Sequence, residues 1–347
     1  MGDAAASPEP PFGQRVAPAL TLVLLAPVVA EFLLADFTVR ELGILVALAP
    51  LYGCGALLIR EITRRAHRGW PTIVLLALAY ALLEEAFLTQ SLFNPNYVGQ
   101  RLLDYGFIPS LGTSLNWTSF VLSIHIVWSV ATPILIAEGL AAERRTTPWL
   151  KQPGLIVTTL LFLLGCAATA AFSLKSSPFV ASTMQFVVSA VFIVGVIVVA
   201  FAAFRPEPWQ PSTAQAAPSR WLVCVIMLVL ASVYFAGESI AHERGMPPVA
   251  PLVFRLACEG TATWLLVIWS TRRGWDARHY LAVATGTTLT YFLFGLNALM
   301  RGHTNLGAPT NAVDVTGHIA LGVAVFGLIV LGARANRRQE RTESVVS

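Results

Sequence analysis

The most regular feature of the chain is the alternation of long apolar runs with short polar segments. A helix needs roughly 20 mainly apolar residues to cross about 30 Å of hydrocarbon. Apolar runs of this kind lie at residues 16–38, 42–62, 71–93, 117–140, 153–174, 183–204, 220–238, 249–271, 279–298 and 312–333. The pattern therefore predicts an all-α, polytopic transmembrane helix bundle with ten spans.

The composition supports the same class and excludes a soluble globular protein. Hydrophobic residues make up 56% of the 347 residues and charged residues only 12%, far outside the usual soluble range. The runs leave no room for a separate soluble domain. The opening segment, MGDAAASPEPPFGQR, is acidic and rich in proline, unlike the basic start of a cleaved signal peptide. We expect the first helix to be retained.

The basic residues predict the orientation, because Lys and Arg near helix ends stay on the cytoplasmic side. Most of the 23 Lys and Arg residues fall in cytoplasmic segments when the N-terminus is placed inside. Both termini are then cytoplasmic. We expect a multi-pass protein of the cell membrane, specifically of a bacterial cytoplasmic membrane. The net charge of +4 follows from this bias, so the lipid bilayer is an expected partner and nucleic acid is not. Glu138, at a helix end, is expected to be solvated.

The predicted organisation along the chain has five parts. They are a cytoplasmic N-terminal tail (1–15), membrane helices one to six with Glu84, Glu85 and His125 (16–204), a flexible cytoplasmic linker (205–219), membrane helices seven to ten (220–333) and a basic cytoplasmic tail (334–347). The linker is assigned from its Pro, Ala and Ser content.

Ionisable residues inside the predicted spans are the strongest functional signal. Each costs roughly 2.5–3.5 kcal/mol on insertion scales unless it is paired or faces a cavity. Those at similar depth, in what the topology makes the outer half of the bilayer, are Glu31, Glu84, Glu85, His125, Arg255, Glu259, Asp314 and His318. We expect them to surround a polar cavity that opens outward. Taken singly, a residue of this kind more often makes a hydrogen bond between packed helices than it takes part in a functional site.

Helical spacing suggests partners for some of these residues. Asp314 lies four residues before His318, so its carboxylate could hold the imidazole in one tautomer. Arg255 and Glu259 are also four residues apart and can pair within the membrane, more often as a structural ion pair than as a site. Asn297 shares a helix face with other polar residues and is expected to support the cavity.

The adjacent Glu84 and Glu85 differ from the other buried residues, because two like charges in a medium of low dielectric cannot both ionise cheaply. At least one of them is expected to be protonated. A carboxylate beside its protonated neighbour, with an imidazole across the cavity, can activate a water and protonate a leaving group. The pair therefore predicts acid–base chemistry, with His125 on the next helix as its partner.

These residues resemble the first two motifs of glutamate-dependent intramembrane peptidases of the CAAX-protease and bacteriocin-processing type. In that family a Glu-Glu pair on a membrane helix is followed by an Arg, and a Phe and a His lie on the next helix. Glu84 and Glu85 match the pair, and Phe120 and His125 stand on the next helix, so the resemblance covers about residues 70–130.

The chain departs from that family's pattern in three places. Thr89 stands where the family has its Arg, and Phe120 lies five residues before His125 rather than four. A third motif, His followed by Asn or Asp, is absent from the sequence of the fifth and sixth predicted helices. His318 with Asp314 could replace it only in reversed order and much later in the chain.

The resemblance implies hydrolysis of a peptide bond in or near the membrane, in a membrane-anchored peptide. Glu84 or Glu85 would be the general base for water, and His125, with Asn297 or His318, would stabilise the oxyanion. No cofactor is predicted.

A proton-coupled transporter or exporter of a small molecule is the alternative. Its proton relay would consist of Glu31, Glu84, Glu85 and Glu259. Arg255 would bind an anionic substrate. Pro27 and Pro50 favour this alternative, because broken helices are common at the binding sites of transporters.

A metal hydrolase is a third class, since Glu and His can coordinate zinc. The chain has no H-E-x-x-H motif and no two His four residues apart, and its four cysteines lie in predicted helices without C-x-x-C spacing. No metal site is therefore predicted. A purely structural or sensory membrane protein is the remaining alternative.

Overall fold

The computed structural model describes residues 12–204 and 213–346, most of which lie in helices. The α-helices are α1 (Phe12–Pro27), α2 (Leu45–Leu48), α3 (Cys54–Arg65), α4 (Trp70–Leu83), α5 (Leu115–Ile124), α6 (Thr132–Leu140), α7 (Gln152–Ser176), α8 (Thr183–Ala202), α9 (Arg220–Glu243), α10 (Val249–Ser270), α11 (Ala277–Met300) and α12 (Ala312–Val346). The π-helical turns are η1 (Val28–Phe32), η3 (Ala49–Gly53), η4 (Glu84–Leu88) and η6 (His125–Ala131), and the 3₁₀ turns are η2 (Val39–Ile44), η5 (Tyr97–Gly99) and η7 (Ala142–Arg144). Two short ladders pair β1 (Phe107–Ile108) antiparallel with β2 (Thr113–Ser114) and β3 (Thr213–Ala216) parallel with β4 (Arg272–Arg273).

Nine helices in the described part of the chain are long and apolar enough to cross a membrane, which confirms the predicted multi-pass bundle. The first apolar helix, Val16–Phe32, is shorter than the predicted run 16–38. It ends because the backbone N–H of Asp36 turns back to the Glu31 carbonyl at 2.9 Å and Ala35 adopts a left-handed φ of 65°.

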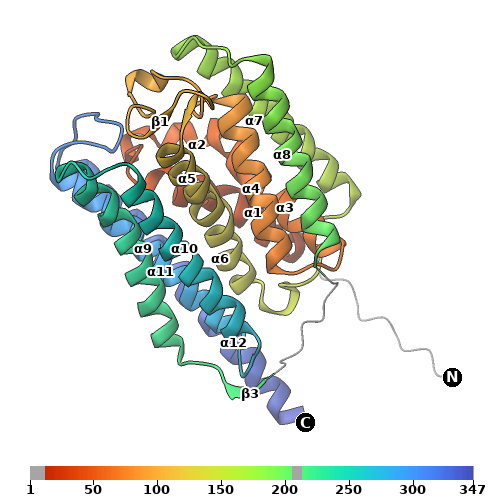
Figure 1. Ribbon diagram of the computed structural model, residues 1–347. Coiled ribbons are helices and arrows are strands. Elements are labelled where there is room, and N and C mark those ends of the chain that lie inside the picture. Colours follow the sequence, from red (N-terminus) through yellow and green to blue (C-terminus); the bar gives the residue numbers. More distant parts are fainter. Residues whose placement is uncertain (1–11, 205–212, 347) are drawn as a thin grey trace.

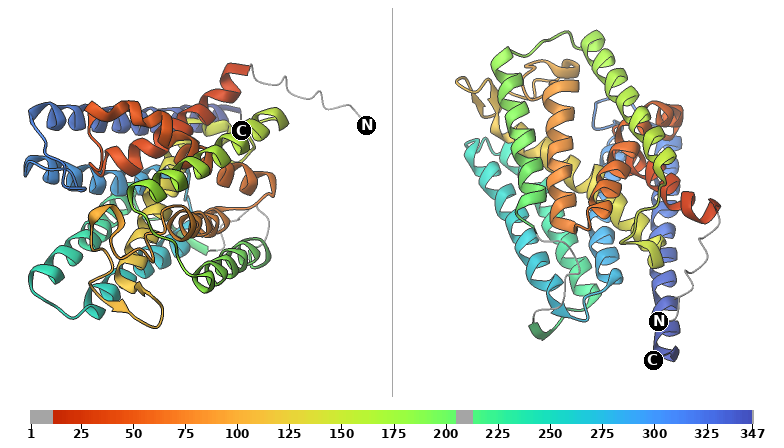
Figure 2. Two further views of the ribbon diagram at one scale, coloured as in Figure 1. Left: turned by 90° about the horizontal axis from the view of Figure 1, so that it is seen from above. Right: turned by 90° about the vertical axis from the view of Figure 1, so that its right-hand side faces the viewer.

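The helices form one bundle with the continuous helix from Leu115 to Leu140, made of α5, η6 and α6, in its middle (Figures 1 and 2). This central helix is the most buried of the span-length helices. One apolar cluster joins it to α9, α10, α11 and α12, and a second joins it to α1, α3 and α4. α7 and α8 are the least buried spans, as expected of helices that face lipid. Polar residues of the central helix are therefore held inside the protein.

Close packing of the first two apolar helices requires glycine at Gly53, in η3. A Cβ at this position would lie 2.0 Å from the backbone oxygen of Val23 in α1. We predict that Gly53→Ala lowers the stability by about 1–3 kcal/mol, because the two backbones must separate. Gly195→Ala in α8 is the matched control, since nothing lies within 4 Å of that Cβ. Thermal unfolding in detergent measures both variants, and equal melting temperatures would refute the prediction.

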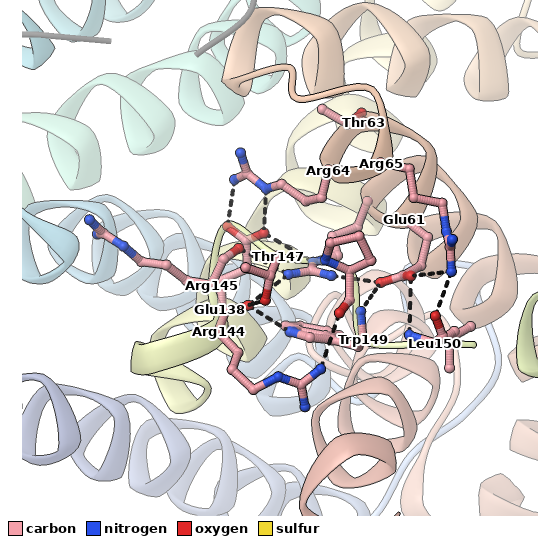
Figure 3. A network of polar contacts seen from close by, with 12 residues as sticks. Glu61, Thr63, Arg64, Arg65, Glu138, Arg144, Arg145, Thr147, Trp149 and Leu150 are labelled. Atoms are coloured by element: carbon pink, nitrogen blue, oxygen red, sulfur yellow. Dashed lines mark hydrogen bonds and ion pairs between the residues drawn. The ribbon is translucent and has the colours of Figure 1, made fainter. Parts of the chain in front are cut away.

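A buried ionic network closes the end of the bundle where α3 and α6 meet (Figure 3). Glu138 accepts hydrogen bonds from Arg64 Nη2 at 2.8 Å and from Arg60 Nε at 3.1 Å. The Arg60 guanidinium lies 3.6 Å from the centre of the Trp149 ring. The expectation that Glu138 is solvated was wrong: only 6% of it is exposed. The loop after α6 folds over the network and offers backbone carbonyls to Arg60, so the carboxylate is paired instead of hydrated.

The predicted tails and linker are described only in part. Residues 1–11 and 205–212 lie outside the described residues. The rest of the predicted linker includes β3, which pairs with β4 and so is not free coil. α12 continues through the predicted C-terminal tail to Val346, and the buried Asn336 donates to the Gly139 carbonyl at 2.8 Å. The start of that tail is therefore part of the bundle.

Candidate functional site

Glu84, Glu85 and His125 lie together inside the bundle, where η4 faces the central helix. Glu85 Oε1 is 2.8 Å from His125 Nε2, and Glu84 Oε2 is 3.5 Å from His125 Nδ1. Ser129, one turn further along, places its Oγ 3.1 Å from the same Nδ1. The exposed fractions of the three main residues are 2%, 4% and 5%, so the imidazole is held between two carboxylates away from bulk water.

Other side chains hold the Glu85 carboxylate in one orientation. Thr89 Oγ1 donates to Glu85 Oε2 at 3.0 Å, and Ser91 Oγ donates to the same oxygen. Trp117 Nε1 donates to Ser91 Oγ at 3.0 Å, which ties the loop after η4 to α5. Thr89 thus contacts the cluster from the position where the resembling family has an Arg, but it does so as a neutral donor.

Glu84 has a different environment. Its Oε2 is buried and has no donor at ordinary hydrogen-bond geometry among the described residues, although the hydroxyls of Tyr52 and Tyr80 lie near the carboxylate. Tyr52 and Tyr80 both lie close enough to Glu84 to interact electrostatically. The His125 ring stacks with Tyr52 at 6.0 Å and meets Tyr80 edge-on at 6.3 Å. A buried polar atom without a partner is costly, so a ligand oxygen or water would be stabilised here.

Four π-helical turns of the described chain bring the cluster together. Glu31 lies in η1, Tyr52 in η3, Glu84 and Glu85 in η4, and His125 in η6. A π turn is rare and often marks a functional site, because the extra residue redirects the side chains that follow. Proline accounts for two of them: Pro27 precedes η1 and Pro50 lies at the start of η3, and neither can donate an α-helical hydrogen bond.

Glu31, on the first apolar helix, and Asp36, in the turn after it, extend the cluster. Each lies close enough to His125 to interact electrostatically, and Asp36 also interacts with Glu31. Glu31 was predicted from the sequence, whereas Asp36, in the turn after η1, was not. Four carboxylates and one imidazole therefore share a buried region, and their negative charge must be balanced by protons or by a cation.

Three tyrosines near the cluster were also missed. Tyr52 and Tyr80 lie beside Glu84, and Tyr97 reaches the cluster from the loop after η4. Burial raises the pKa of the Tyr97 phenol, and the nearby glutamates raise it further. Tyrosine is ordinary in membrane helices and at interfaces, so its position in the sequence carried no signal. The only hint was Pro50, which marked a break in the helix of Tyr52.

Three residues predicted for the site lie elsewhere. Asp314 accepts hydrogen bonds from Arg40 Nε and Nη2 at 2.7 and 2.8 Å, so the prediction that it holds His318 was wrong. A guanidinium is the stronger partner, and η2 brings one within reach. His318 Nε2 instead lies 3.0 Å from the Phe292 carbonyl oxygen, with the two rings stacked at 5.0 Å. Asn297 is exposed on α11.

Arg255 and Glu259 connect α10 to the central helix. Arg255 Nη2 donates to the backbone oxygen and to Oδ1 of Asn116 at 2.9 and 2.8 Å, and Glu259 accepts from Ser123 Oγ at 2.5 Å. The two residues are also electrostatic neighbours, as their spacing predicted. Their contacts hold the helix that carries His125.

Glu84, Glu85 and His125 also form a set that could hold a metal ion, since one ligand atom of each lies within 4.8 Å of the others. Two carboxylates and an imidazole suit zinc or another divalent cation, which would balance part of the buried negative charge. No metal site was predicted from the sequence, because these ligands come from two helices about 40 residues apart and form no compact motif.

A family model described as an uncharacterized membrane protein family matches residues 20–338. The chain belongs to this family. Comparison with curated proteins and with solved structures gives no match. The matched range includes every residue of the cluster. The family and the apolar helices together establish a membrane protein. What the cluster does must therefore be inferred from its geometry.

Proposed function

We propose that the protein is an intramembrane hydrolase in which Glu84 is the general base and the Glu85–His125 pair assists it. The observation that carries this proposal is the difference between the two glutamates. Donors fix Glu85, whereas the buried Glu84 Oε2 has no donor at ordinary hydrogen-bond geometry among the described residues and lies 3.5 Å from His125 Nδ1. A free carboxylate oxygen beside an imidazole is the arrangement that deprotonates a water and then protonates a leaving group.

In the proposed reaction Glu84 accepts a proton from water, and the resulting hydroxide oxygen bonds to the carbonyl carbon of the scissile amide. The C–N bond then breaks, and the proton held by Glu84 passes to the leaving nitrogen. Glu85 orients the imidazole so that Nδ1 of His125 faces the carbonyl oxygen of the scissile amide. There it stabilises the negative charge that develops on this oxygen. The resemblance of residues 70–130 to glutamate-dependent intramembrane peptidases supports a membrane-anchored peptide as substrate.

A cleavage assay in lipid bilayers tests this proposal. We expect the reconstituted protein to produce new fragments, detected by mass spectrometry, from a library of membrane-anchored peptides. Glu84→Gln should produce none. Metal content and inhibition by a chelator separate a carboxylate-activated water from a metal-activated one. Fragments that persist unchanged in Glu84→Gln, or their absence with every class of peptide, would rule out the proposed mechanism.

A proton-coupled transporter is the second candidate, favoured by the extension of the cluster to Glu31 and Asp36. One pair of carboxylates suffices for hydrolysis, whereas a chain of carboxylates with an imidazole is typical of proton relays in membrane transporters. Substrate movement in vesicles that follows an imposed pH gradient and disappears in Glu31→Gln would favour transport. A hydrolase would process its substrate without any gradient.

A further inference from the structure

A cavity of about 520 Å³ lies at the end of the bundle that carries the buried ionic network. The ends of α3, α6 and α10 and the start of α11 surround it, and none of its lining residues belongs to the Glu84 cluster. The arginine-rich segments after α3 and α6 lie at this end, which the positive-inside rule assigns to the cytoplasm. The volume is within the range of ordinary ligand sites.

The acidic residues of the cavity wall are already paired. Glu138 binds the arginines of α3, and Asp276 binds Arg220 and His279. Burial alone would raise the pKa of Asp276, but hydrogen bonds from His279 and Arg220 hold it below its usual range. This carboxylate is therefore ionised and paired at neutral pH. The described residues of the wall therefore present no unpaired negative charge that would repel an anion.

The wall also contains donors without acceptors. Among the described residues, the side chains of Arg68 and Arg145 make no ion pair and no hydrogen bond, although both line the cavity. Figure 3 shows the Arg145 side chain extending away from the network around Glu138. The indole N–H of Trp275 is buried and has no acceptor in the described part of the chain. Two half-buried guanidinium groups without a partner in the described chain, together with a buried N–H, favour an anionic ligand.

An aromatic wall completes the cavity. Trp70 stacks on Tyr280 with ring centres 5.7 Å apart, and Trp275 meets Tyr280 edge-on at 5.6 Å. Aromatic side chains that carry a polar atom collect at the level of lipid headgroups. The cavity therefore offers both cationic donors and an apolar surface.

We propose that this cavity binds the phosphate group of an anionic ligand at the cytoplasmic side of the membrane. Guanidinium groups match the oxygens of a phosphate, which can accept from both arginines at once. An anionic lipid headgroup and free phosphate offer the same chemistry, and the aromatic wall favours the lipid. The site is independent of the proposed hydrolase, because the two share no residue.

Ligand-dependent thermal unfolding of the full chain in neutral detergent distinguishes the two sources. We expect phosphatidic acid to raise the melting temperature and phosphatidylcholine to leave it unchanged. An equal rise with inorganic phosphate would support the site with free phosphate as the ligand. A melting temperature that neither phosphatidic acid nor inorganic phosphate changes would overturn the proposal.

Variants locate the effect within the cavity. The double variant Arg68→Gln/Arg145→Gln should weaken the apparent affinity for phosphatidic acid about tenfold or more, since charge-assisted hydrogen bonds are lost. Arg244→Gln/Arg301→Gln is the matched control, because it removes the same charge from exposed positions after α9 and α11. Trp275→Phe removes the N–H together with part of the aromatic ring but leaves both guanidinium groups, and should cause a smaller loss. An equal loss in the control, or none in Arg68→Gln/Arg145→Gln, would contradict a specific site.

Discussion

Replacing Glu84 by Gln is expected to reduce hydrolytic activity about 10²- to 10⁴-fold, the usual contribution of a positioned general base. A glutamine amide cannot accept the proton of the attacking water. The loss of thermal stability should be smaller than for Glu85→Gln, because Glu84 Oε2 makes only the 3.5 Å contact with His125 and the change also removes a like charge beside Glu85. Cleavage rate and melting temperature measured on the same preparation check both parts.

The neighbouring change, Glu85→Gln, should behave differently. Both oxygens of Glu85 are engaged, one with His125 and the other with Thr89 and Ser91. An amide would turn its NH₂ group toward one of these partners, so we expect a loss of stability of about 1–3 kcal/mol together with a loss of activity. Equal melting temperatures for the Glu84 and Glu85 variants would show that the two side chains do not have the separate roles proposed.

Asn297→Ala serves as the negative control for activity. The sequence pattern placed Asn297 among the supporting residues, but its side chain is exposed on α11. Full activity is therefore expected, and a large loss would return this residue to the site.

Glu138→Ala should lower the free energy of unfolding by about 3–5 kcal/mol, the largest stability effect expected in the chain. The substitution leaves the Arg64 guanidinium, 3% exposed, buried without its carboxylate. Arg60, 0% exposed, loses one of its two carboxylates and keeps Glu61 at 2.6 Å. Desolvated charges without a partner are the most costly defect in a protein interior. Denaturant-induced unfolding in mixed micelles measures the difference.

Two comparisons separate this effect from a general loss of charge. Glu143→Ala removes an exposed acid from η7, just after α6, and should change the free energy of unfolding by less than about 0.5 kcal/mol. The double variant Arg64→Met/Glu138→Leu replaces Arg64 and its carboxylate together, while Arg60 keeps Glu61, and should be more stable than Glu138→Ala. If Glu138→Ala unfolds like the wild type, the network does not carry the stability assigned to it.

The sequence was sufficient to predict the membrane bundle and the approximate bounds of its helices. Hydropathy is a local property, so each window of about 20 residues reports on its own span. The Glu84–Glu85 pair was also visible, because charge in an apolar run is improbable without a role. His125 followed from its place on the next helix, and the structure puts it 2.8 Å from Glu85.

The partners of other buried groups depended on the tertiary structure. Asp314 pairs with Arg40, which is 274 residues away, although His318 stands at helical spacing on the same helix. Glu138 lies at a helix end, yet a loop that folds back over it buries it. Spacing along one helix indicates which side chains share a face, but it does not indicate which residues of neighbouring segments pack against that face.

The sequence by itself thus determined that the chain forms apolar helices and that several carboxylates lie within these membrane spans. Only the tertiary structure decided which of those carboxylates meet, through four π turns in the described chain that redirect Glu31, Tyr52, Glu84 and His125 toward one another. The physical reason is that the preference of a segment for the membrane is the sum of the hydropathies of consecutive residues, which the sequence contains. A hydrogen bond instead needs two atoms within about 3 Å, and the rotation of each helix about its own axis sets that distance.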